Sequence, residues 1–182
     1  MHERMIRTDI QQAMMNIGLE YYHPADTGPT FVERPDILSI NGVVIECKTV
    51  KPKRRVEPWF NPKEISNKQR RQLDYYCFTR HFLTFLAIGT LWQPRRMWCI
   101  PWISWVNMEN SLFSKDGLDF RVTISSLGIY PWGEMTRNKT KKKWEFQDRH
   151  PIFLANNRQE HKPEDWNPIS IRFPEPEKKQ EA

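Results

Sequence analysis

The order of elements along the chain predicts an α/β fold, in which helices pack on a mixed β-sheet. Three observations support this expectation. Residues 3–18 form an amphipathic stretch at helical spacing. Asn41-Gly42 separates two apolar segments and is a strong hairpin signal. Residues 82–89 form a continuous apolar run, as expected of a strand that is buried on both faces.

The first helix is predicted from one apolar stripe, and Gly18 ends it. The stripe consists of Ile6, Ile10, Ala13, Met14 and Ile17. A loop follows over residues 23–29, which are polar and contain two prolines. The hairpin then pairs residues 37–40 with residues 43–50.

The hairpin can adopt two registers, and they place Asp36 on opposite faces of the sheet. A two-residue loop would put Asp36 opposite Cys47 and therefore on the other face from Glu46. A three-residue loop over residues 40–42 would instead pair Asp36 with Glu46. Such loops end in a left-handed residue, and glycine adopts that conformation at least cost. We therefore expect Ser39 opposite Val43 and a positive φ at Gly42.

A second helix is expected over residues 66–80, with Ser66 as its N-cap and Gln69 at the third position. Residues 97–100 are predicted to form another strand, which Pro101 ends. Leu118, Phe120, Val122 and Ile124 alternate and predict a strand with one exposed face. We place a core domain at residues 1–130 and a basic, aromatic extension at 131–182, with a disordered tail.

The charge distribution favours a polyanionic partner such as DNA. The formal net charge is +6, and basic residues are grouped in two runs. We assign DNA binding to Lys51, Lys53, Arg54 and Arg55 in the first run, and to Lys141, Lys142 and Lys143 in the second. The second run leads into Trp144 and Phe146, and basic residues beside aromatic ones suit phosphate contact with base stacking. Alternatively, the runs are solvated loops and the eight tryptophans belong to the core.

Several other classes of protein are disfavoured. No apolar run is as long as a membrane span, so we expect no membrane partner. The N-terminal residues lack the layout of a secretory signal, and the three cysteines are widely spaced. These features indicate a reduced, cytoplasmic protein without structural zinc. The five histidines have no metal or triad spacing, and there is no glycine-rich phosphate loop.

Asp36, Glu46 and Lys48 form a constellation that suits metal-assisted cleavage of a phosphodiester. In a strand, Glu46 and Lys48 point to the same face, and Asp36 arrives on the neighbouring strand. Mg²⁺ prefers oxygen ligands and commonly takes one or two carboxylates, with Mn²⁺ as a substitute. A lysine beside them can orient the attacking water or stabilise developing charge. An ordinary half-buried strand would also place Glu46 and Lys48 on its wet face.

These residues also resemble the signature of the PD-(D/E)XK nucleases, which reads here as Pro35-Asp36, nine residues, and Glu46-Cys47-Lys48. The stretch Ser66-Asn67-Lys68-Gln69 is similar to the helix opening of Holliday-junction resolvases and virus-type replication-repair nucleases. The resemblance covers residues 3–105. It implies a restriction-endonuclease-like core with a mixed β-sheet flanked by helices, and metal-dependent cleavage of DNA. It also implies a catalytic role for Gln69, although Ser-x-x-Gln is equally a helix capping box.

Members of this family often add an acidic residue from the first helix. Glu3 and Asp9 are the candidates, and we favour Glu3 because it lies within the arc of the apolar stripe. With Glu3 added, the residues expected to bind the metal are Glu3, Asp36, Glu46 and Cys47. The function predicted is that of a metal-dependent DNA endonuclease acting on branched recombination or repair intermediates. A single-strand or nicking nuclease and a non-catalytic nucleic-acid-binding module are the alternatives, and a homodimer is considered.

Overall fold

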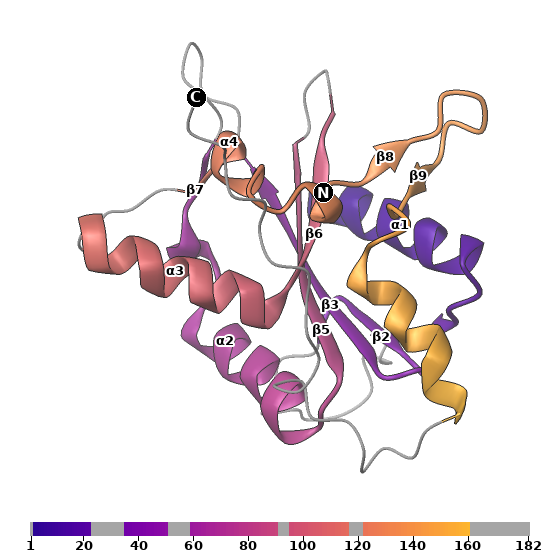
Figure 1. Cartoon of the computed structure of the whole chain (residues 1–182), viewed down its shortest axis with the longest axis horizontal. Coiled ribbons are helices and arrows are strands. Elements are labelled where there is room, and N and C mark those ends of the chain that lie inside the picture. The colour runs from indigo at the N-terminus through magenta and orange to yellow at the C-terminus, as the bar shows by residue number, and fades with distance from the viewer. Residues whose placement is uncertain (1, 23–34, 51–58, 91–94, 117–121, 161–182) are drawn as a thin grey trace.

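Five strands form one mixed sheet at the centre of the protein (Figure 1). The computed structural model describes residues 2–22, 35–50, 59–90, 95–116 and 122–160. The sheet order is β1-β2-β3-β5-β6. Among the described strands, only β3 and β5 are parallel neighbours, and the connection between them includes α2. The strands are β1 (Tyr21–Tyr22), β2 (Ile37–Ser39), β3 (Val43–Val50), β5 (Leu83–Thr90) and β6 (Met97–Pro101).

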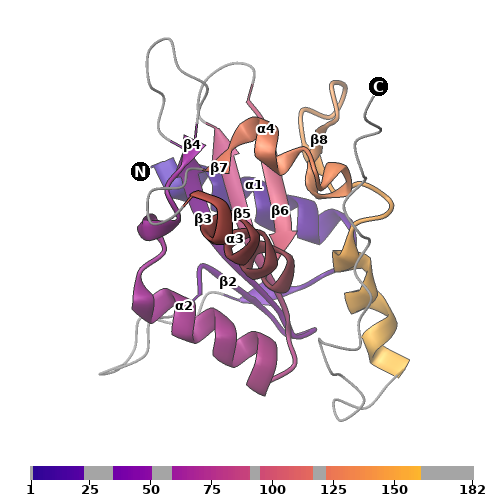
Figure 2. The same cartoon turned by 60° about the vertical axis from the view of Figure 1, so that its left-hand side comes forward.

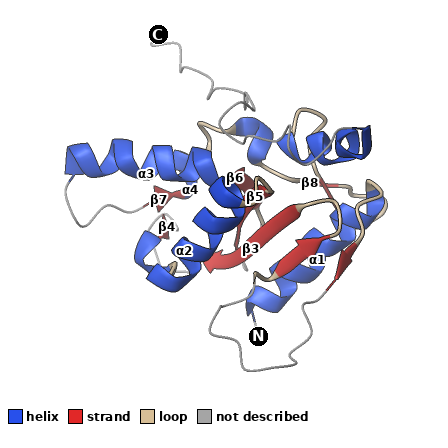
Figure 3. Cartoon of the chain, turned by 90° about the horizontal axis from the view of Figure 1, so that it is seen from below, coloured by secondary structure: helices blue, strands red, loops and turns tan. Residues whose placement is uncertain are grey.

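Helices cover both faces of this sheet, so the α/β fold class is confirmed. One face carries α1 (His2–Asn16) and the 3-10 helix η5 (Pro151–Glu160), and the other carries α2 (Asn67–Asp74) and α3 (Trp102–Asp116). Figure 2 shows α2 and α3 in front of the strands with α1 behind them. The view from below separates the same layers (Figure 3).

Shorter elements lie at the margins of the sheet. Two small ribbons pair β4 (Trp59–Phe60) with β7 (Val122–Thr123), and β8 (Thr136–Arg137) with β9 (Trp144–Glu145). Among the described residues, the remaining short helical elements are η1 (Pro62–Glu64), the π-helical η2 (Tyr75–Thr79), α4 (Ile124–Leu127) and η4 (Pro131–Gly133).

Two predicted elements need correction. The strand expected to reach Ile124 is wrong at its end, because Ile124 begins α4. Thr123 ends β7, and its hydroxyl accepts a hydrogen bond from the Ser126 amide, which caps the new helical turn. The start of that strand lies outside the described residues. The helix expected over residues 66–80 is α-helical only as far as Asp74, after which the chain continues as a π-helical turn.

The predicted hairpin register is confirmed. Ile37 lies opposite Ile45 and Leu38 opposite Val44. Counting outward, Ser39 then opposes Val43 and Asp36 opposes Glu46. Gly42 has a φ of 70°, and its amide donates to the Ser39 carbonyl at 3.1 Å, closing the loop. The tight two-residue alternative is therefore excluded.

Alternate residues of the central strands point into two separate hydrophobic clusters. Val43, Ile45 and Cys47 of β3 face the cluster beneath α1. Val44 and Val50 face the cluster beneath α2 and α3. Gly89 lets α1 approach β5 closely, because a Cβ atom at this position would overlap the Ile6 side chain. Helix α1 is therefore held tightly against the sheet.

Residues 131–160 add to the core beneath α1. Met135, Trp144, Phe146, Ile152 and Ala155 are buried in the same cluster as the apolar stripe of α1. Five of the six described tryptophans are buried, so these five are core residues and not exposed stacking platforms. The tail from residue 161 onward lies outside the described residues.

The three cysteines, Cys47, Cys77 and Cys99, are free and buried. Within the described ranges, none of the helices combines the length and the apolar composition that crossing a bilayer would require.

His150 joins residues 131–160 to β6. Its Nε2 lies 2.7 Å from the Cys99 carbonyl oxygen, and its Nδ1 accepts a hydrogen bond from the Ile152 amide at 3.1 Å. The ring is therefore the neutral Nε2–H tautomer. It is buried and contacts Phe85 and Phe146. Burial lowers the pKa of His150 from 6.5 to about 4.

The lowered pKa of His150 predicts a loss of stability in acid. Between pH 6.5 and pH 4 the unfolded chain binds a proton that the folded chain excludes, so the free energy of unfolding falls as pH falls through this window. The full effect is on the order of 3 kcal/mol. We expect His150→Gln to lose this dependence. Unfolding by urea at pH 7, 6, 5 and 4.5 would measure it, and parallel pH profiles for the two proteins would contradict the prediction.

Candidate active site

The site forms at the N-terminal end of β2, where the antiparallel strand β3 extends past the last residue of β2 that pairs with it. The Asp36 carboxylate Oδ2 accepts a hydrogen bond from the Cys47 amide at 2.8 Å. The carboxylate thus occupies the place on β3 that a carbonyl of a longer β2 would take. This bond fixes Asp36 beside Glu46, because the two residues are opposed in the ladder.

Glu46 and Lys48 lie on the face of β3 that α2 covers, and both are buried. The Lys48 Nζ donates to Glu46 Oε1 at 2.9 Å. Desolvation, followed by the nearby Asp36 charge, raises the pKa of Glu46 to about 7, although Lys48 opposes the shift. Desolvation also disfavours the charged form of Lys48, but the surrounding carboxylates outweigh it and raise the pKa of Lys48. The simpler alternative, in which Glu46 and Lys48 lie on a solvent-exposed strand face, is therefore excluded.

Gln69 connects α2 to Glu46. Its side-chain Oε1 accepts a hydrogen bond from the Ser66 backbone amide at 3.0 Å. The Gln69 backbone amide donates to Ser66 Oγ at 3.1 Å, which completes the predicted capping box. With Oε1 engaged, the Nε2 group turns to the sheet and donates to Glu46 Oε1 at 2.6 Å. The same side chain thus caps the helix and binds the buried carboxylate.

Two polar contacts with α3 help to hold helix α2 in place. Arg70, the residue after Gln69, makes a bidentate pair with Glu109 of α3, with both N–O distances at 2.7 Å. The Trp102 indole donates to Asp74 at 2.7 Å. These contacts hold the helix that presents Gln69 to the sheet.

The first helix contributes Glu3 and not Asp9. Glu3 Oε1 lies 4.0 Å from Lys48 Nζ, although its side chain is 53% exposed. Asp9 instead pairs with Arg95 at 2.5 Å. Sequence reasoning missed Arg7, whose guanidinium lies 3.7 Å from Asp36 Oδ1. The signal was its spacing, since residues at i and i+4 share a helix face and Arg7 is four residues after Glu3.

Cys47 does not offer its thiol to this site. The side chain lies on the opposite face of β3, buried in the cluster beneath α1. Burial raises the pKa of the Cys47 thiol well above its ordinary value, so it is not a thiolate. The backbone of Cys47 does face the site, because its amide binds Asp36. Only a backbone atom of this residue could contact a metal beside Asp36 and Glu46.

The donors that converge here are hard oxygens. Both hydrogen bonds to Glu46 use Oε1, and among the described residues its Oε2 accepts none. Within the described part of the chain, Asp36 Oδ1 has only the longer contact with Arg7. Two carboxylates fit Mg²⁺, which commonly retains several waters. Within the described ranges, no three or more His, Cys, Asp or Glu residues are grouped closely enough to hold a metal ion by themselves.

The basic residues assigned to DNA binding are not at this site as far as the structure describes them. Lys51, Lys53, Arg54 and Arg55 lie outside the described residues. Lys141, Lys142 and Lys143 are exposed on the turn between β8 and β9. This turn borders a cavity of about 450 Å³ at the C-terminal end of α1. The cavity is therefore separate from the carboxylates at the N-terminal end of the same helix.

Comparison of the chain with protein-family models, with curated proteins and with solved structures finds no match.

The buried Glu46–Lys48 pair predicts a specific pattern of stability. Lys48→Met should destabilise the fold by about 3 kcal/mol, because it leaves the buried Glu46 carboxyl without its cation. Adding Glu46→Gln should restore most of this loss, since the charge that needed a partner is gone. Urea unfolding of the two single variants and the double variant at pH 7.5 would measure the coupling. Additive effects would show that the pair contributes no coupling to the folded state.

Proposed function

We propose that this protein is a divalent-metal-dependent DNA endonuclease. The observation that carries the proposal is the convergence of Asp36, Glu46, Lys48 and Gln69 at one edge of β3. Glu46 and Lys48 are buried beside the partly exposed Asp36. Proteins rarely bury a carboxylate and a lysine together for stability, because the desolvation of charged groups offsets their attraction. A carboxyl group with a pKa raised as far as that of Glu46 is typical of functional sites.

Each residue of the site has a separate role in the proposed reaction. Asp36 and Glu46, through the oxygens that make no short hydrogen bond, would hold the metal together with water. The bound cation would supply a water of lowered pKa and neutralise charge on the scissile phosphate. Lys48 would place its ammonium against the charge that develops in the transition state. Gln69 orients Glu46, because its amide is fixed by the capping box.

Two further residues adjust the charge of the site. Glu3 stands beside Lys48 and, being half exposed, could bind a water of the metal's hydration shell. Arg7 pairs with Asp36 and is itself partly exposed, so it could turn to a DNA phosphate once the metal neutralises Asp36. The mixed sheet with helices on both faces is compatible with a restriction-endonuclease-like core. The sequence resemblance is the basis for expecting branched DNA as the substrate.

The first test of the proposal is metal dependence. Protein freed of metal by chelation should not cut DNA, and cleavage should appear with Mg²⁺ or Mn²⁺, because the available ligands are carboxylate oxygens. A labelled four-way junction, a duplex and a single strand of the same sequence would be incubated together with the protein and analysed on denaturing gels. Undiminished cleavage in excess chelator would refute the metal site.

The second test separates catalysis from binding. Lys48→Met and Asp36→Asn should each reduce the cleavage rate by about 100-fold or more, since the first removes the cation that stabilises the transition state and the second weakens the metal site. Binding to the same DNA in Ca²⁺ should persist, because neither residue is part of the exposed basic run. Asn at position 36 retains an oxygen for the Cys47 amide, so the strand edge is kept.

The matched control is Lys68→Met, the same exchange at an exposed position of α2. It should cut at the wild-type rate. Rates would be measured at a temperature where circular dichroism shows all variants folded. Wild-type rates in Lys48→Met or Asp36→Asn would remove the basis of the proposed function.

A further inference from the structure

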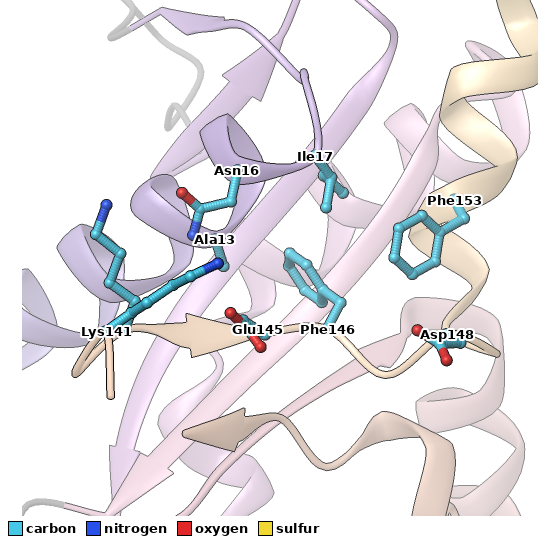
Figure 4. A pocket seen from close by; sticks show the side chains of 9 residues that line it. Ala13, Asn16, Ile17, Lys141, Glu145, Phe146, Asp148 and Phe153 are labelled. Carbon is cyan, nitrogen blue, oxygen red and sulfur yellow. The ribbon is translucent and has the colours of Figure 1, made fainter. Parts of the chain in front are cut away.

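The cavity at the C-terminal end of α1 is lined on one part by apolar side chains and on another by lysines. Its apolar wall is made by Ala13 and Ile17 of α1 and by the rings of Phe146 and Phe153. Lys141 and Lys143 line it from the turn between β8 and β9. At about 450 Å³ it lies in the size range of small-ligand sites. In the view of Figure 4, Phe153 lies toward one end of the cavity and Lys141 toward the other.

We propose that this cavity binds one unpaired nucleotide of the DNA on which the enzyme acts. The inference rests on the proposed function and adds to it a second contact with an unstacked base. The ring of Phe153, which is only partly buried, offers a stacking surface to any base. The lysine side chains supply mobile cations for the adjoining phosphate.

The charges within the cavity favour one orientation of the nucleotide. Glu145 and Asp148 also line it, and their carboxylates repel phosphate but can accept hydrogen bonds from the amino groups of a base. Asn16 adds an amide that can donate or accept. The phosphate would therefore lie at the lysines, and the base would lie between the carboxylates and the Phe153 ring.

The surrounding surface is complementary to a nucleic acid strand. The β8–β9 ribbon and its turn expose five basic side chains, namely Arg137, Lys139, Lys141, Lys142 and Lys143. Along α1, Glu3 and Asn16 are thirteen residues apart, which corresponds to about 20 Å. A stacked strand covers that length with about six nucleotides. The nucleotide held in the cavity would thus be about six positions from the bond that is cleaved.

A charge-matched pair of double variants tests the lysines. Lys141→Gln with Lys143→Gln removes two charges that line the cavity. Lys139→Gln with Lys142→Asn removes two charges from the same turn that do not, and Asn suits the φ of 55° at position 142. With a 12-nucleotide single strand in Ca²⁺, we expect fluorescence anisotropy to show at least a fivefold greater loss of affinity for the first pair. Equal losses would overturn the proposal and indicate non-specific attraction.

A base-deletion scan tests the pocket itself. Replacing one nucleotide at a time with an abasic residue should weaken binding by about 5- to 100-fold at the position that enters the cavity. This positional cost should disappear in Phe153→Leu, which keeps apolar volume but has no ring to stack on. Circular dichroism would verify that the variant folds. A cost that persists in Phe153→Leu, or no positional cost in the wild type, would overturn the proposal.

A cleavage assay on the same proteins distinguishes failure of the nucleotide-pocket proposal from failure of the proposed nuclease function. Metal-dependent cutting by wild-type protein, together with identical binding of all cavity variants, would overturn the nucleotide pocket and leave the nuclease assignment intact. Absence of both cleavage and DNA binding in the wild type would overturn the proposed function, and the pocket assignment with it.

Discussion

The candidate site depends first on the register of one hairpin. A three-residue loop ending in Gly42 at a φ of 70° sets Ile37 opposite Ile45, and this pairing carries Asp36 to the face of Glu46. A slip by one residue would send Asp36 into the opposite layer, since strand side chains alternate. The Asp36 carboxylate then accepts a hydrogen bond from the Cys47 amide, and this bond takes the place of the next backbone hydrogen bond between β2 and β3. A backbone preference of one glycine thus decides which side chains meet.

The second requirement is that α2 lies firmly over the buried pair. Gln69 reaches Glu46 only because the helix begins at Ser66 and stays fixed on the sheet. The bidentate contact of Arg70 with Glu109 supplies that restraint next to Gln69 in sequence. Glu46 nevertheless remains crowded, with a raised pKa and one oxygen without a hydrogen bond among the described residues. Under the proposed function, a bound cation would stabilise the ionised form of this group.

Sequence patterns predicted the features that depend on local geometry. The helix stripe, the hairpin loop and the capping box each follow from residues within a few positions of one another. Contacts between distant residues were not accessible in this way. Nothing near Asp9 indicates its partner Arg95, which lies 86 residues away. The hydrogen bond from Gln69 Nε2 to Glu46 likewise requires a strand residue 23 positions earlier. The packing of residues 131–160 beneath α1 was missed for a similar reason, because their polar composition conceals a few buried aromatic side chains such as Trp144 and Phe146.

Helix α1 connects the candidate catalytic residues with the cavity at its other end. Its first turns carry Glu3 and Arg7 beside the carboxylates, while Ala13, Asn16 and Ile17 border the cavity. Gly89 allows the helix to lie close to β5, and the buried stripe from Ile6 to Met14 fixes its rotation. A packed helix of this kind keeps its two ends at constant separation. Under the proposed function, α1 would therefore fix how far the bound nucleotide lies from the cleaved bond. No contact between the two ends is needed, because the spacing follows from the length of the helix alone.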